Sequence, residues 1–222
     1  MIELKNIEKG YRNPETGEYE SIIQIPELTI GEKDHIAIAG PSGTGKTTLL
    51  HLLSGLISPE KGSIVVDGTD ITSLSESGRD RFRADNIGYI FQSFNLLDGY
   101  TALENVMLGM TFTGKGSDKA KATETLKSLG LAERLHYRPS ELSTGQQQRV
   151  CIARAIVNNP KIILADEPTG NLDPATTREI LAILKENAKD KILIIVTHES
   201  DVLDQFEHHL DLLKFKPQEQ LS

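Results

Sequence analysis

The chain has 222 residues, of which 38% are hydrophobic and 25% are charged, and its formal net charge is −8 at pH 7. These values are typical of a globular protein, and 24 basic against 32 acidic residues disfavour a broad electrostatic surface for DNA or RNA. No apolar run approaches the ~20 residues that span a bilayer, and the N-terminal residues do not resemble a secretory signal. We therefore expect one composite domain in the cytoplasm, without nucleic acid as a partner.

The first part of the chain carries β-like patterns. Ile2 and Leu4 begin an alternating run, a turn-rich stretch covers residues 13–18, and further short runs cover Ser21–Ile25 and Leu28–Ile30. These patterns predict a small antiparallel sheet that leads into the next strand.

Residues 40–47 match the pattern Gly-x-x-x-x-Gly-Lys-Ser/Thr, between a strand predicted over Ile36–Ala39 and a helix predicted from about Lys46. Glycines let successive backbone N–H groups approach a phosphate, and the helix adds the positive end of its dipole. We expect Lys46 to reach the β- and γ-phosphates and the Thr47 hydroxyl to hold Mg²⁺. The expected cradle consists of Gly40, Pro41, Ser42, Gly43, Thr44, Gly45, Lys46, Thr47 and Thr48. Tyr11, near the start of the chain, is expected either to stack on a nucleotide base or to pack against the edge of the sheet.

The middle of the chain begins with β signals and then becomes helical. Asp67-Gly68 predicts a tight turn after a strand over residues 64–66, and a β-branched and aromatic run over residues 87–91 stops at Gln92. That amide is expected at the end of a strand, where ligands of open α/β sheets gather. Helices are predicted over Leu103–Met110, Asp118–Leu129 and Gly145–Val157. The lone cysteine, Cys151, has apolar neighbours and is expected to be a small buried residue rather than a nucleophile.

Two later apolar runs are each followed by ionisable residues. The run over residues 161–165 ends in Asp166 and Glu167, and the run over residues 192–196 leads to His198. We expect Asp166 to orient Mg²⁺ directly or through water and Glu167 to polarise the attacking water. His198 is expected either to donate to the γ-phosphate or to hold the water-polarising group in place.

Residues 142–146, Leu-Ser-Thr-Gly-Gln, closely resemble the Leu-Ser-Gly-Gly-Gln signature of the ATP-binding cassette (ABC) family. The resemblance covers nearly the whole chain and implies ATP and Mg²⁺ as ligands and ATP hydrolysis as the activity. It implies adenine stacking by Tyr11, a Q-loop and Mg²⁺ ligand at Gln92, the Walker B pair at Asp166 and Glu167, a D-loop at residues 171–173 and a switch histidine at His198.

The implied fold is an α/β P-loop NTPase core with an N-terminal antiparallel β subdomain and an inserted α-helical signature subdomain. We expect the core at residues 1–92 and 160–222 and the helical subdomain at about residues 93–159. The implied assembly is a head-to-tail dimer in which the N-terminal N–H groups of the signature helix cap ATP bound to the other copy. Its expected contacts are Ser143, Gly145 and Gln146, whereas Thr144 replaces a glycine and would be strained if that position needed a positive φ.

Within the family, the stretches at residues 87–97, 101–106 and 169–173 look like the branch of lipoprotein-release, macrolide-export and antimicrobial-peptide-resistance cassettes. The expected partner is thus a separate integral membrane subunit, which would hold this chain on the cytoplasmic face of the membrane. Leu96, Leu97 and Tyr100 are expected either to line a groove for that partner or to pack in the helical lobe. Alternatives are a soluble ABC-type ATPase that acts as a mechanical switch, as in DNA repair or translation, and an ATP-binding switch without hydrolysis, which Glu167 and His198 disfavour.

Overall fold

The computed structural model describes residues 1–41, 43–114 and 116–216. Within them the strands are β1 (Ile2–Arg12), β2 (Tyr19–Ile30), β3 (His35–Ala39), β4 (Lys61–Val66), β5 (Thr69–Asp70), β6 (Ile87–Ile90), β7 (Ile162–Asp166), β8 (Ile192–Val196) and β9 (His208–Asp211). The α-helices are α1 (Lys46–Leu53), α2 (Glu76–Asn86), α3 (Ala102–Leu108), α4 (Lys119–Ser128), α5 (Thr144–Ile156), α6 (Pro174–Asn187) and α7 (Ser200–Leu203). Short 3₁₀ turns cover Ala132–Arg134, Pro139–Glu141 and Leu212–Phe215.

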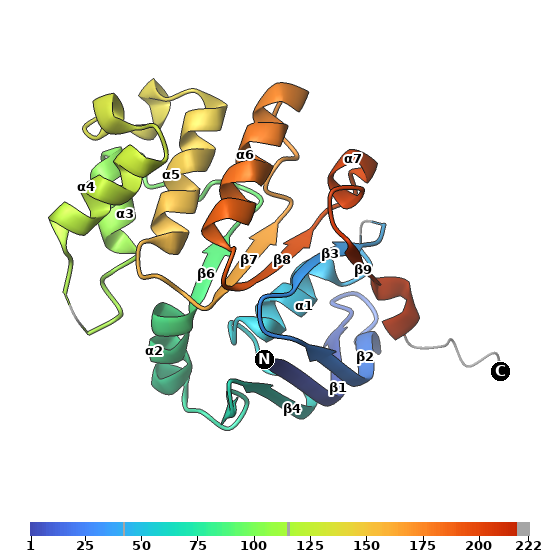
Figure 1. Cartoon of the computed structure of the whole chain (residues 1–222). Coiled ribbons are helices and arrows are strands. Elements are labelled where there is room, and N and C mark those ends of the chain that lie inside the picture. The colour runs from blue at the N-terminus through green and yellow to red at the C-terminus, as the bar shows by residue number, and fades with distance from the viewer. Residues whose placement is uncertain (42, 115, 217–222) are drawn as a thin grey trace.

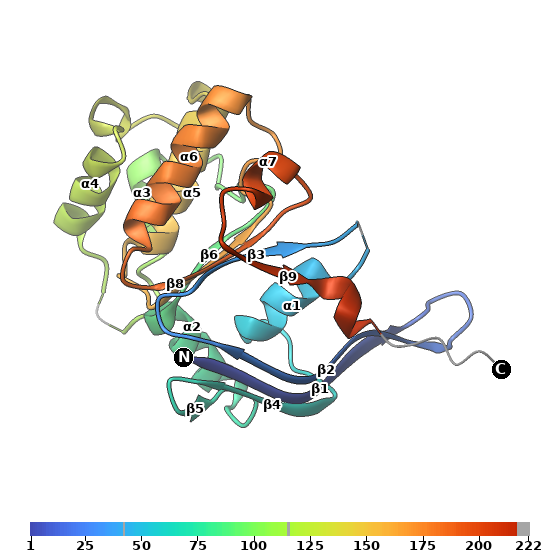
Figure 2. The same ribbon diagram turned by 45° about the vertical axis from the view of Figure 1, so that its right-hand side comes forward.

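The strands form two sheets with different pairing. One is antiparallel in the order β2-β1-β4-β5, and the other is parallel in the order β6-β7-β8-β3-β9. Helix α1 lies between the two sheets, while α3, α4, α5 and α6 lie on the far side of the parallel sheet (Figures 1 and 2). The predicted fold class, an α/β core with an antiparallel β part and a helical insertion, is confirmed.

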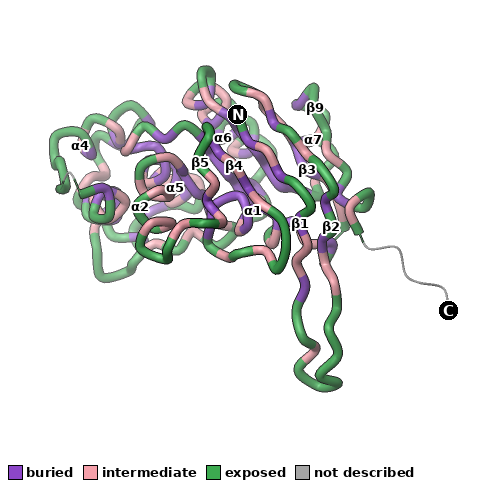
Figure 3. The backbone as a smooth tube through the Cα atoms, turned by 90° about the horizontal axis from the view of Figure 1, so that it is seen from below, coloured by how far each residue is buried: buried purple, intermediate pink, exposed green. Residues whose placement is uncertain are grey.

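Strand β2 differs from its prediction, because it is one continuous strand rather than two short runs. Its pairing with β1 extends from Ile2↔Ile30 to Arg12↔Tyr19 and passes over Pro26, between the pairs Lys5↔Glu27 and Ile7↔Ile25. Proline is tolerated here because β2 is an edge strand of its sheet. The far end of the β1–β2 hairpin extends beyond the body of the molecule as a mostly exposed arm (Figure 3).

Strands β6, β7 and β8 are buried on both faces, and alternate residues of β7 therefore belong to different cores. Ile162 and Leu164 of β7 pack with α1 and the antiparallel sheet, whereas Ile163 and Ala165 pack with the helices on the far side. Asp166 is two positions after Leu164, so its side chain lies on the same face of β7 as that of Leu164. The strand thus directs this carboxylate towards α1, and the next residue must leave the strand in another direction.

The helices predicted over residues 103–110, 118–129 and 145–157 are α3, α4 and α5 with small shifts at their ends. Helix α2 was not predicted, because it buries none of its residues and so carries no apolar stripe. Ser75 nevertheless caps it by accepting a hydrogen bond from Gly78 N at 3.2 Å. In the part of the chain that the structure describes, we found no helix with the length and hydrophobicity of a membrane span. The boundaries of the helical subdomain, about residues 93–159, stay a proposal.

Candidate active site

The loop between β3 and α1 has the backbone geometry that its glycines predict. Gly43 and Gly45 have φ values of 79° and 94°, in the left-handed region that disfavours a Cβ atom. A Cβ atom on Gly40 would lie 2.7 Å from the Thr44 hydroxyl oxygen, which itself donates to the carbonyl of Pro41 at 2.8 Å. Larger residues at these positions would therefore distort the loop. Ser42, which belongs to the predicted cradle, lies outside the described residues.

Lys46 is buried in spite of its charge. Only 6% of the residue is exposed, and its ammonium group donates to the carbonyl oxygens of Gly40 at 2.8 Å and Pro41 at 3.0 Å. These bonds satisfy the ammonium group without a carboxylate partner, which leaves its positive charge available to an anion in the loop.

Thr47 and Asp166 meet where α1 begins and β7 ends. The Thr47 side chain lies beside the Asp166 carboxylate and lowers its pKa. Burial and the neighbouring Glu167 raise the pKa of Asp166, and burial is the largest cause, while Thr47, His51 and Lys46 act in the opposite direction. The parity of β7 explains this meeting, because it directs Asp166 towards the α1 side of the sheet.

Glu167 is held between two side chains from neighbouring strand ends. Its Oε2 accepts a hydrogen bond from Gln92 Nε2 at 3.1 Å, and its Oε1 lies 3.0 Å from His198 Nδ1. The backbone of Glu167 has a φ of 44°, a left-handed conformation that costs a glutamate roughly 1–3 kcal/mol and persists only when the surroundings impose it. Of the two roles expected for His198, the geometry favours the one in which it holds Glu167.

These residues surround a cleft of about 480 Å³. Its lining consists of Tyr11, Ile22, Gly43, Gly45, Lys46, Thr47, Thr48, Gln92, Glu167 and His198. Tyr11 is 47% exposed and lines this cleft, with the Lys9 ammonium 5.3 Å from its ring centre. A larger pocket of about 630 Å³ lies at the opposite ends of the parallel strands, next to Lys161 and Lys191, so pocket size alone does not locate the predicted residues.

The signature residues lie apart from the cleft, at the start of α5. Ser143 Oγ accepts from Gln146 N at 3.3 Å and Gln146 Oε1 accepts from Ser143 N at 3.0 Å, which forms a reciprocal capping box. Thr144 is the first residue of the helix and does not have a positive φ, so the strain considered for it does not arise. Gly145 is needed for packing, because a Cβ atom there would lie 2.8 Å from Thr176 Cγ2 on α6.

Two further polar residues join the loops of the site and were not predicted. The hydroxyl of Thr169 donates to Glu199 Oε1 at 2.9 Å, although the two residues are 30 positions apart. Both lie close to predicted motifs: Thr169 is two residues after Glu167, and Glu199 immediately follows His198. Proximity to those motifs was the available signal, but their pairing depends on β7 and β8 being neighbours in the sheet.

Comparisons with known proteins identify the family of the chain and agree with its fold. The sequence model of the family described as "ABC transporter" matches residues 23–170. The chain is 44% identical over 206 residues to the macrolide export ATP-binding/permease protein MacB of Bdellovibrio bacteriovorus, covering 92% of this chain and 31% of MacB. It is 45% identical over 202 residues to the lipoprotein-releasing system ATP-binding protein LolD of Geobacter metallireducens, covering 89% of each. The dimeric ATP-binding cassette MJ0796, solved in a post-hydrolysis state with ADP and Pi, superposes with a TM-score of 0.86 at 38% identity over 96% of this chain and 95% of that one.

Proposed function

Because the chain belongs to the ABC transporter family, whose model matches residues 23–170, we propose that it is the ATP-hydrolysing subunit that powers a separate membrane subunit. The observation that carries this proposal is Glu167, which is held between Gln92 and His198 beside a phosphate-binding loop. A carboxylate in that position can accept a proton from a water molecule that attacks a phosphate.

In this proposal different residues of the chain have separate roles in phosphoryl transfer. The loop N–H groups and Lys46 hold the phosphates and offset their charge, and Tyr11 at the rim of the cleft stacks on the adenine. Glu167 orients and polarises the attacking water, while His198 and Gln92 fix the carboxylate in place.

The donor set at the end of β7 fits Mg²⁺. Thr47 and Asp166 bring a hydroxyl and a carboxylate oxygen together, and Mg²⁺ prefers such hard oxygen ligands and takes only one or two from the protein when phosphates supply others. In the described segments no group of three or more His, Cys, Asp or Glu residues is placed to hold a metal. Bound there, Mg²⁺ would offset the charge of the β- and γ-phosphates, and the oxygen of the Gln92 amide is a third candidate ligand.

A second copy completes the site in this proposal. The cleft is lined by residues from the loop and strand ends, whereas Ser143, Gly145 and Gln146 lie at the start of α5 outside it. A helix N-terminus favours an anion, so the signature of one copy is suited to cap the phosphates held by another. The solved structure of MJ0796 is a dimer, which supports a head-to-tail pair here.

The membrane partner is proposed from the relatives and from an apolar cleft. MacB is named an ATP-binding/permease protein and LolD belongs to a lipoprotein-releasing system. A cleft of about 390 Å³ between α2, β6 and α3 is lined by Leu56, Tyr89, Phe91, Leu108 and Phe112, among others, and Phe112 is 74% exposed. This cleft suits an apolar segment of the partner, which would hold the chain at the cytoplasmic face of the membrane. Leu97 and Tyr100 are also exposed, but they do not line this cleft, and Leu96 packs against the core.

The test combines turnover and assembly. Glu167→Gln should abolish ATP turnover while keeping ATP bound, and should give an ATP-dependent dimer in gel filtration that the wild type forms only transiently. Lys46→Ala in the same background should lose nucleotide affinity in calorimetry and fail to dimerise. Wild-type turnover by Glu167→Gln would refute the role of Glu167. Affinity purification from membranes that recovers the chain without an integral protein would instead favour a soluble mechanical ATPase.

A further inference from the structure

We propose that Thr169 and Glu199 form a brace that holds the catalytic carboxylate of Glu167 against His198, and that both are positioning residues for hydrolysis. This inference rests on the proposed function. Its starting point is the strain at Glu167, whose φ of 44° needs support from the surrounding structure.

Two backbone hydrogen bonds hold the turn after Glu167. Glu167 N donates to Val196 O at 2.9 Å, and Gly170 N donates back to Glu167 O at 3.3 Å. The first bond ties the residue to β8, and the second closes the turn on itself. Neither bond reaches the segment after β8 that carries His198, so these bonds do not fix the spacing between the two side chains.

The brace connects the turn after Glu167 to the segment after β8. Thr169 is completely buried, and its hydroxyl donates to Glu199 Oε1 at 2.9 Å. Glu199 follows His198 directly, and its backbone N–H donates to Thr197 Oγ1 at 3.0 Å. Thr197 is completely buried as well. Glu199 is therefore held through both its backbone N–H and its side-chain carboxylate.

Two side-chain hydrogen bonds therefore connect the same two loops, and they differ in how far water can reach them. One joins Glu167 to His198 in the cleft, and the other joins Thr169 to Glu199 behind it. His198 is 56% exposed in its side chain, so the cleft-side link competes with water, whereas the Thr169 donor is shielded. The shielded bond between Thr169 and Glu199 sets the distance between the loops, and the exposed bond between Glu167 and His198 depends on that distance.

If the brace positions Glu167, its loss should affect the rate of hydrolysis and the binding of ATP differently. Neither brace residue lines the nucleotide cleft, so its loss should leave ATP affinity intact. A displacement of Glu167 by even about 1 Å, in contrast, can cost on the order of 100-fold in a chemical step that depends on alignment. The brace should thus affect kcat and not KM.

The experiment compares Thr169→Val, which removes the hydroxyl at nearly constant shape, with Thr169→Ser, which keeps it. Thr169→Val should lower kcat at least about tenfold, with KM and ATP affinity within about twofold, and Thr169→Ser should restore most of the rate. Glu199→Ala should resemble Thr169→Val, and combining the two should cost little more than either alone.

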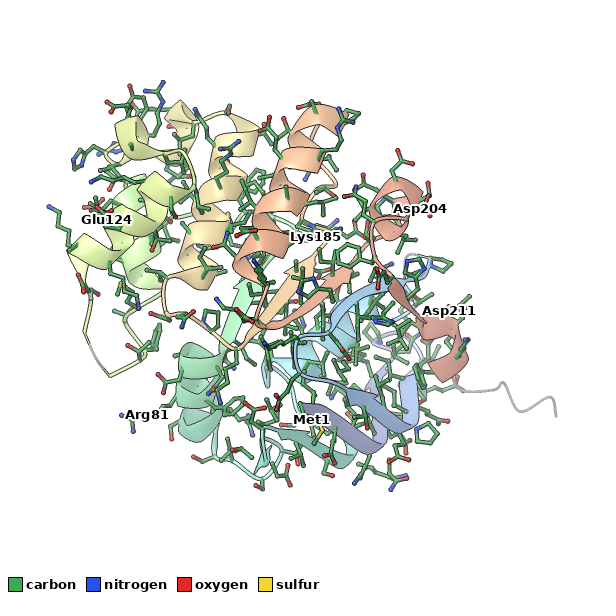
Figure 4. All side chains as sticks on the ribbon, in the orientation of Figure 1. Met1, Arg81, Glu124, Lys185, Asp204 and Asp211 are labelled. Atoms are coloured by element: carbon green, nitrogen blue, oxygen red, sulfur yellow. The ribbon has the colours of Figure 1, made fainter. Side chains whose placement is uncertain are left out.

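Thr125→Val is the matched control, because it removes a hydroxyl bond of 2.9 Å to Lys121 O within α4. Its neighbour Glu124 and Asp204, the residue directly after α7, lie at opposite sides of the molecule (Figure 4). This control should keep the wild-type kcat.

The outcomes separate the brace from the proposed function. If wild-type protein has no ATPase activity, the proposed function is refuted and the brace, which rests on it, is refuted with it. If the wild type is active and folded Thr169→Val or Glu199→Ala keeps its kcat, the brace is refuted. Equal losses in Thr169→Ser and Thr169→Val would also refute it, because the hydroxyl would then be irrelevant. ATP-dependent dimerisation of Thr169→Val in the Glu167→Gln background, measured by gel filtration, should be unchanged, and its loss would assign the effect to assembly instead.

Discussion

The Nδ1 atom of His198 lies 3.0 Å from Oε1 of Glu167, although 31 positions separate the two residues in the chain. They meet because β7 and β8 are adjacent parallel strands, with Asp166 paired to Val196. Residues that follow such strands emerge at the same edge of the sheet. The contact makes the position of the carboxylate, and not only its presence, a property that can be tested.

His198→Ala should lower ATP turnover by at least about tenfold, because Glu167 loses one of the two side-chain bonds that orient it. ATP affinity should change by less than about twofold, since the loop and Lys46 are untouched. Steady-state ATPase assays and calorimetry measure the two quantities. His209→Ala is the control: His209 Nε2 bonds to Leu203 O at 2.8 Å, outside the cleft. Wild-type turnover by His198→Ala would remove His198 from this role.

Gly145→Ala should destabilise the protein by about 1–3 kcal/mol, because the new Cβ would lie 2.8 Å from Thr176 Cγ2. Adding Thr176→Ser removes that methyl group and should recover most of the lost stability in urea unfolding. If stability recovers but turnover does not, Gly145 has a separate role in the assembled site. Equal stability of the single and double variants would contradict the packing explanation.

Cys151 should be inert to thiol reagents in the native protein. It is 1% exposed, its thiol donates to Phe94 O at 3.1 Å, and burial raises its pKa to about 12. At a pH of about 8 the thiolate is therefore scarce, and reagents cannot reach it. A chromogenic disulfide reagent should detect no thiol before guanidinium chloride is added and one per chain afterwards. Rapid labelling of the native state would show that the α5 region opens.

Asp67 should contribute stability that depends on pH. Its carboxylate accepts hydrogen bonds from Lys161 Nζ at 2.7 Å and from the Met1 amino group at 2.8 Å, which hold its pKa below the usual value. Because the pKa is lower in the folded state, the contribution is full above the unfolded value of about 3.9 and is lost as the pH falls through the folded-state pKa.

The matched variant is Asp67→Asn, since Asp67 has a φ of 46° and asparagine also tolerates this conformation. It should cost at most about 1 kcal/mol at neutral pH, because the carboxylate is partly exposed and screened, and less at a pH near 3. Asp190→Asn, which breaks a fully exposed pair with Lys33, should have no measurable effect. Urea unfolding at both pH values measures this, and a difference that does not shrink in acid would contradict the electrostatic origin.

Much of the fold could be predicted because its signals are local. The β3-loop-α1 unit follows from an apolar run, a glycine pattern and a helical pattern that are contiguous in the chain, and α3, α4 and α5 follow from their apolar periodicity. Helix α2 was not predicted because none of its residues is fully buried and its sequence carries no apolar stripe. The continuity of β2 was not predicted, because Pro26 indicates a break between strands unless the strand is known to lie at a sheet edge.

The sequence by itself determined which chemical groups the site contains, because the phosphate loop, the carboxylates after β7 and the histidine after β8 each carry their own motif. Only the tertiary structure decided how these groups are joined. The strand order places His198 and Gln92 on either side of Glu167, the parity of β7 directs Asp166 to Thr47, and the neighbouring strand ends bring Thr169 to Glu199. These contacts link residues far apart in the chain, and their geometry depends on how the strands pair, which no local pattern encodes.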